Sequence, residues 1–122
     1  MDHPMLTSAR LAKENAAFRG TGGVSRGNRR LGFRPAFLDF ATMTVYPSRF
    51  ADGRAAPCHI LDGLPDAAVR SRMPDGRVAQ AKCTIVSGFE RDGYFYTRRA
   101  AARAVEQWRM LEEADLEEGA PD

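Results

Sequence analysis

Four Asp-Gly pairs divide the middle of the chain into short segments, and they limit the fold more than any other feature. They stand at Asp52-Gly53, Asp62-Gly63, Asp75-Gly76 and Asp92-Gly93, spaced by 10, 13 and 17 residues. Asp-Gly favours the positive φ angles of the tight turns that join antiparallel strands. Residues 36–96 therefore predict an antiparallel sheet connected as a meander.

The clearest expected strand covers residues 78–86, where apolar and polar side chains alternate: Ala79, Ala81, Cys83 and Ile85 with Gln80, Lys82 and Thr84. This period of two is typical of a strand with one buried face, so we expect Cys83 to be buried. The strand should continue past a bulge or bend at Gly88 to Arg91 and turn back into residues 94–96. Three further strands are expected over residues 36–40, 43–46 and 58–61, about five in all.

Helices are expected at both ends of this sheet. Thr7 or Ser8 can cap a helix that runs to about Phe18, and Pro65 predicts one helical turn through residue 69. Thr97 can cap a closing helix with a stripe of apolar residues at three- and four-residue steps: Ala101, Ala104, Val105, Trp108 and Leu111. The predicted fold class is therefore α+β, with the C-terminal helix packed on one face of the sheet.

The length of 122 residues predicts a single domain spanning residues 1–122, with a core that needs no metal or disulfide. No apolar run exceeds three residues, which excludes a membrane span and the apolar core of a signal peptide. We therefore expect a cytoplasmic protein with no membrane partner. A disulfide between the two cysteines, Cys58 and Cys83, is disfavoured in that compartment, although their separation cannot be judged from the sequence.

Charge is distributed unevenly along the chain. Residues 1–104 carry a net charge of +8 and residues 105–122 a net charge of −6. Carboxylates after Leu111 meet the negative end of the helix dipole, so the closing helix should fray there and leave residues 112–122 as an acidic, mobile tail. This tail could fold back onto the basic residues, or pair with them across a dimer.

The arginine-rich residues 19–34 are the main candidate for a binding site. They hold five Gly, five Arg and no acid, a composition typical of a mobile loop. Arginine pairs through two parallel hydrogen bonds with carboxylate or phosphate. The residues expected to contact a partner, three of them from the closing helix, are Arg26, Arg29, Arg30, Phe33, Arg34, Arg98, Arg99 and Arg103.

These residues predict a non-catalytic binding or regulatory module that docks an acidic partner. An acidic protein surface is favoured over nucleic acid, because the net charge is only +2 and no nucleic-acid fold motif is present. Three alternatives stay open. The same loop could bind nucleic acid, the chain could be a small inhibitor encoded by a phage or mobile element, or the arginines could pair with the protein's own carboxylates.

Catalysis and metal binding have little support, and no cofactor is expected. Residues 23–27 match the G-x-S-x-G nucleophile motif around Ser25, but no strand precedes it and only His59 follows as a base. Cys58 and His59 are neighbours, which point to opposite sides of a strand, and the cysteine spacing of zinc sites is absent. Asp39 is the one sheet-region aspartate without an evident turn or cap role. Cys58, His59 and Asp39 are therefore the only residues left for an enzyme hypothesis.

Three stretches carry a resemblance: residues 32–39 (GFRPAFLD), residues 48–53 (SRFADG) and residues 59–65 (HILDGLP), together with Tyr96-Thr97-Arg98. With these motifs the chain resembles a set of short uncharacterised bacterial proteins from about Gly20 to Trp108. The resemblance implies a compact bacterial domain and assigns no activity, ligand or site residue.

Overall fold

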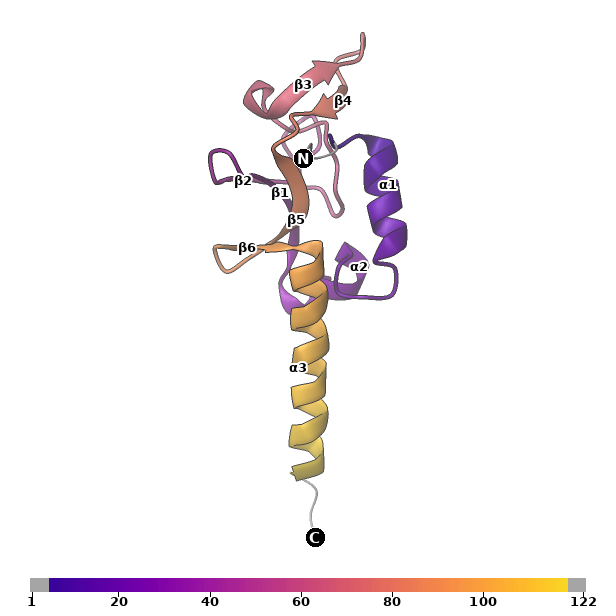
Figure 1. Ribbon diagram of the computed structural model, residues 1–122, viewed down its shortest axis with the longest axis vertical. Helices are drawn as coiled ribbons and strands as arrows, with labels where there is room; N and C mark the ends of the chain where they lie inside the picture. Colours follow the sequence, from indigo (N-terminus) through magenta and orange to yellow (C-terminus); the bar gives the residue numbers. More distant parts are fainter. Residues whose placement is uncertain (1–4, 119–122) are drawn as a thin grey trace.

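Six strands form two antiparallel sheets in the computed structural model, which describes residues 5–118 (Figure 1). The larger sheet has the order β2-β1-β5-β6, and the smaller one pairs β3 with β4. The strands are β1 (Arg34–Asp39), β2 (Thr44–Pro47), β3 (Val69–Arg72), β4 (Val78–Ala81), β5 (Ile85–Arg91) and β6 (Tyr94–Thr97). The predicted α+β class with antiparallel pairing is confirmed, but the β3–β4 hairpin interrupts the single meander that the sequence suggested.

The Asp-Gly pairs all lie in turns or bends, but only two of them join paired strands. Asp92 and Gly93 have φ angles of 52° and 85° and connect β5 to β6. Asp75-Gly76 connects β3 to β4, and Asp52-Gly53 closes a loop in which Arg49 bridges Ala55. The Asp-Gly pairs therefore predicted the positions of the turns correctly, whereas packing in the core determines which strands pair.

The expected strand over residues 78–86 is wrong, because β4 and β5 belong to different sheets. The chain turns between them, where the Ile85 amide donates to the Lys82 carbonyl at 3.0 Å. Cys83 lies in this turn and is exposed rather than buried. Gly88 is not a bulge either: it stays in register with both neighbouring strands, and a Cβ there would overlap the ring of Phe95.

Residues 58–61 do not form the expected strand. A side chain holds this segment instead: the Ser48 hydroxyl donates to the Cys58 carbonyl at 2.7 Å and accepts from the Ile60 amide at 2.8 Å. The segment thereby inserts His59 and Leu61 into the core without joining a sheet.

The helices at both ends are capped as expected. Thr7 Oγ1 accepts from the Arg10 amide at the start of α1 (Ser8–Ala17), and Thr97 Oγ1 accepts from the Ala100 amide at the start of α3 (Arg98–Glu118). The expected fraying after Leu111 is wrong, because α3 continues as a helix to Glu118 and projects from the body (Figure 1). The rest of the expected tail, residues 119–122, lies outside the described residues. Three short helices complete the chain: α2 (Ser25–Asn28), η1 (Arg29–Leu31) and η2 (Asp66–Ala68).

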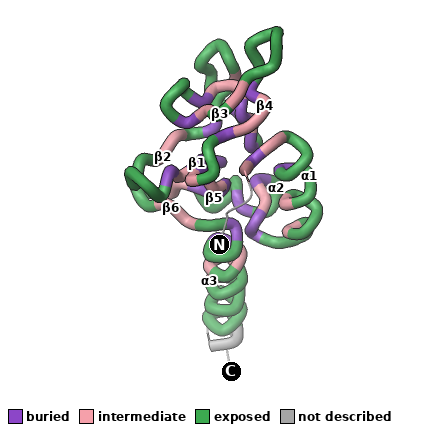
Figure 2. The backbone as a smooth tube through the Cα atoms, turned by 45° about the horizontal axis from the view of Figure 1, so that its top comes forward, coloured by how far each residue is buried: buried purple, intermediate pink, exposed green. Residues whose placement is uncertain are grey.

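Two apolar clusters form the core. The first joins α1 and the smaller sheet to β1 and β5 around Phe37 and Ile85. The second joins β5 to α3 around Phe89 and Ala101, with Phe33 stacked on Trp108 at 5.8 Å between ring centroids. Only the first turns of α3 take part in this packing, and most of its length is exposed (Figure 2).

Within residues 5–118, no helix is both long and apolar enough to cross a membrane. This is the structural counterpart of the short apolar runs in the sequence.

Candidate functional site

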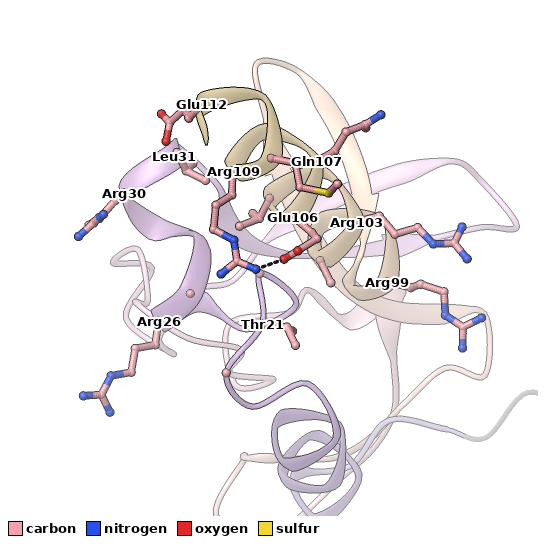
Figure 3. Close-up of a pocket in the computed structure, with 16 residues that line it drawn as sticks. Thr21, Arg26, Arg30, Leu31, Arg99, Arg103, Glu106, Gln107, Arg109 and Glu112 are labelled. Carbon is pink, nitrogen blue, oxygen red and sulfur yellow. Dashed lines mark hydrogen bonds and ion pairs between the residues drawn. The ribbon is translucent and has the colours of Figure 1, made fainter. Parts of the chain in front are cut away.

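A groove of about 1020 Å³ runs between residues 20–31 and α3 (Figure 3). Its apolar lining includes Leu31, Val105 and Met110. Five arginines line it, and we call this site the arginine groove. Arg109 is paired with Glu106, and the other four, which we call the groove arginines, are Arg26 and Arg30 from residues 20–31 and Arg99 and Arg103 from α3.

Glycine allows residues 20–31 to form one wall of this groove. A Cβ at Gly22 would overlap the side chain of Val105 in α3, so only glycine permits this close approach. The amide of Asn28 donates to the Gly22 carbonyl at 2.7 Å, which ties α2 to the preceding turn. The expected loop over residues 19–34 thus includes α2 and η1, is packed against α3 and leads into β1.

Gly27→Ala is expected to lower the free energy of unfolding by roughly 1–3 kcal/mol, the usual cost of overpacking a closed site. The added Cβ would overlap the Thr21 carbonyl oxygen, and a backbone atom cannot move aside by changing rotamer. Chemical denaturation measures the loss, with Arg26→Ala in the same helix as the control because its side chain is exposed. Equal stability of the two variants would show that the wall is not held by this contact.

The four groove arginines have no partner among the described side chains or carbonyls. All four are exposed, and none makes a side-chain hydrogen bond or ion pair with residues 5–116, whose side chains the structure describes. Figure 3 shows Arg26 and Arg30 extending from one side of the groove and Arg99 and Arg103 from the other, with the Arg109–Glu106 ion pair between them. For these four residues, the alternative of pairing with the protein's own carboxylates does not hold in the part of the chain described here.

The other predicted contact residues do not line this groove. Arg29 donates to the Pro57 carbonyl at 3.0 Å, and the exposed Arg34 borders a second cavity of about 410 Å³. Phe33 is only 2% exposed and packs between Phe89, Tyr96 and Trp108. The expectation that Phe33 contacts a partner is therefore wrong for this conformation, since its ring fills the second core cluster.

Arg98 is also placed differently from expectation, because its guanidinium is buried with 4% exposure. Its Nε donates to the Ser87 hydroxyl at 3.0 Å and lies 3.3 Å from a Glu14 carboxylate oxygen. Its two terminal nitrogens donate to the Gly23 carbonyl at 3.0 Å and to His59 Nδ1 at 3.1 Å. Ser87 in turn donates to Glu14. Arg98 therefore joins four distant segments inside the protein and cannot reach a partner.

His59 completes this buried network as a neutral imidazole. Its Nε2 lies 2.6 Å from the Gly88 carbonyl, so it carries the proton, while Nδ1 accepts from Arg98. Burial and, second, the Arg98 charge lower the pKa of His59 to about 4. Burial also lowers the pKa of Arg98, against the opposing effect of Glu14. The guanidinium nevertheless stays charged, because its pKa starts far above neutrality.

The remaining chemical candidates are separated from one another or already engaged. Cys58 and Cys83 are free and exposed, whereas His59 is turned into the core between the rings of Phe37 and Phe89. Asp39 accepts from the Ala41 amide at 2.9 Å, which gives it the turn role that the sequence did not reveal. Ser25 is buried at the first position of α2, preceded by a turn rather than a strand. Within the described residues, no three His, Cys, Asp or Glu side chains are grouped to hold a metal ion.

Comparison of the chain with protein-family models, curated proteins and solved structures gave no match.

Proposed function

We propose that this protein is a non-catalytic binding module that docks an acidic protein segment in the arginine groove. The observation that supports this most is the set of four arginines on both sides of one groove, none with an intramolecular partner among the described residues. Holding like charges around one concave surface is unfavourable until an anion joins them. A carboxylate-bearing segment would supply that anion and accept the parallel hydrogen bonds of the guanidinium groups.

The groove suits a protein segment better than nucleic acid. Its lining contains Leu31 and Met110, which are 38% and 61% exposed and could be covered by apolar residues of a partner. Protein interfaces combine such an apolar centre with a charged rim. The groove also includes Glu106 and Glu112, which would repel a continuous row of phosphates. We therefore infer an amphipathic acidic segment as the partner.

The test compares two labelled probes by fluorescence anisotropy: a helical peptide of Glu and Leu residues, and a single-stranded oligonucleotide of equal charge. The peptide should bind more tightly. Replacing Arg26, Arg30, Arg99 and Arg103 with Ala should weaken peptide binding about 10–100-fold, because each exposed arginine–carboxylate pair contributes roughly 0.2–1 kcal/mol. The matched control replaces four exposed arginines outside the groove with Ala: Arg34, Arg49, Arg54 and Arg70.

Equal losses in the two quadruple variants would contradict the proposal, because net charge rather than the groove would then determine affinity. Tighter binding of the oligonucleotide, with an affinity that falls steeply and linearly in log salt, would favour the nucleic-acid alternative instead.

A further inference from the structure

The charged residues of α3 are arranged unfavourably with respect to the dipole of the helix. Its first turn contains no acidic residue and begins with Arg98-Arg99, while its last turn contains no basic residue. Residues 112–118 carry five carboxylates. A helix dipole favours the opposite arrangement, with acids near the N-terminus and bases near the C-terminus. Each end of α3 therefore carries the sign of charge that an isolated helix disfavours.

An exposed apolar surface lies between these charged ends. Met110 and Leu111 are 61% and 60% exposed in the part of α3 that projects from the body (Figures 1 and 2). Arg99, Arg103, Met110 and Glu113 recur at intervals of four, seven and three residues, so they share one side of the helix. Along this side, the residues change from basic to apolar and then to acidic between the N-terminus and the C-terminus of the helix.

The acidic end of α3 cannot reach Arg99 and Arg103 of its own chain, although Glu112 at its start lines the groove. Residues 112–118 are continuous with the helix that supplies Arg99 and Arg103, and that helix projects away from the body. Folding back would require the helix to break. Pairing with another molecule requires no such change.

We infer that α3 pairs in antiparallel orientation with α3 of a second copy, whose acidic end occupies the Arg99–Arg103 side of the arginine groove. This inference rests on the proposed function, because it names the acidic segment that the groove accepts. At about 1.5 Å per residue, the 21 residues of α3 span about 30 Å. A two-fold axis between residues 108 and 109 puts residues 113 and 117 of one copy within one position of the level of Arg103 and Arg99 of the other.

The pairing offsets both unfavourable features of α3, namely the charges that oppose the helix dipole and the exposed apolar surface. Each acidic helix end meets the basic start of the other helix, and Met110 of both copies lies close to the two-fold axis. The same patch on each copy contacts its counterpart, which closes a symmetric dimer rather than a filament. Because the charged contacts are exposed, the dimer should be weak and sensitive to salt.

Sedimentation velocity measures the association directly. The 13.5 kDa chain should sediment as a dimer in about 50 mM salt and as a monomer in about 500 mM salt, where the screening length falls well below that of dilute buffer. A decisive test then reverses the charges in two variants, Arg99→Glu with Arg103→Glu and Glu113→Lys with Glu117→Lys. Each variant alone should be monomeric, and an equimolar mixture should restore the dimer.

Misfolding does not confuse this experiment, since both variants improve the match to the helix dipole. Circular dichroism should show unchanged helix content in each. The matched control is Arg70→Glu with Arg77→Glu, which changes the net charge by the same amount. Arg70 lies in β3 and Arg77 directly precedes β4, so this variant should leave the dimer intact.

The outcomes separate this inference from the proposed function. A monomeric wild-type chain at low salt that still binds the Glu/Leu peptide would overturn the dimer and leave the binding module standing. A dimer that survives both charge reversals would overturn the antiparallel arrangement. A monomer that binds no peptide would overturn both.

Discussion

Replacing Arg98 with Met is expected to lower the free energy of unfolding by about 3–5 kcal/mol, the usual cost of removing one partner of a buried ion pair. The change would leave the Glu14 carboxylate without its buried cation and the Gly23 carbonyl without its donor. His59 Nδ1 would also lose a donor. Such a loss is a large fraction of the stability of a small domain, so the variant should be partly unfolded at 37 °C.

Urea denaturation followed by Trp108 fluorescence measures this effect. Arg99→Met is the matched control: it is the next residue in the same helix turn, but its side chain is exposed and unpaired among the described residues. Its stability should stay within about 0.5 kcal/mol of wild type. If Arg98→Met and Arg99→Met are equally stable, the buried network does not hold the fold together.

Acidification from pH 7 to pH 5 is expected to cost about 2 kcal/mol of stability, rising to about 3 kcal/mol at pH 4, through His59 alone. The folded-state pKa of His59 is about 4, below its ordinary value of 6.5. Between these values the unfolded chain binds a proton that the folded protein excludes, so stability falls as the pH falls. The physical reason is that a protonated His59 would lose its acceptor nitrogen and face the Arg98 cation.

The slope of denaturation midpoint against pH between 6.5 and 5 checks this prediction, because most carboxylates titrate at lower pH. His59→Gln should flatten the slope, since an amide can accept from Arg98 and donate to Gly88 without titrating. A steep slope that survives in His59→Gln would assign the acid sensitivity to other groups.

Local signals in the sequence predicted much of the fold. Thr7 and Thr97 were identified as caps because side-chain capping depends on neighbours three residues away. The Asp92-Gly93 turn was identified because its φ angles demand those residue types. The break between β4 and β5 was missed because alternation continues through residues 82–84 although the chain reverses there. Periodicity records which side chains alternate, but not whether they share a sheet.

The candidate site was predicted in part, and burial explains the rest. Arg26, Arg30, Arg99 and Arg103 do gather around one groove, although only their charge and local composition identified them. Arg98 was wrongly grouped with them as a surface residue. It stands three residues before Ala101 and seven before Val105, on the same stripe that packs against the sheet. That spacing indicated a buried position for Arg98, but the prediction followed the charge of the residue and placed it on the surface.

The contacts of Arg98 with four distant segments also affect how the protein folds during its synthesis. The partners of Arg98 lie as far as 84 residues away in the chain, at Glu14, with Gly23 at 75 and His59 at 39 residues. The buried contacts that Arg98 makes with Glu14, Gly23, His59 and Ser87 cannot form until Arg98 has left the ribosome. The growing chain therefore lacks these native contacts during most of its synthesis. Truncated chains that end before Arg98 should be degraded rather than fold in part.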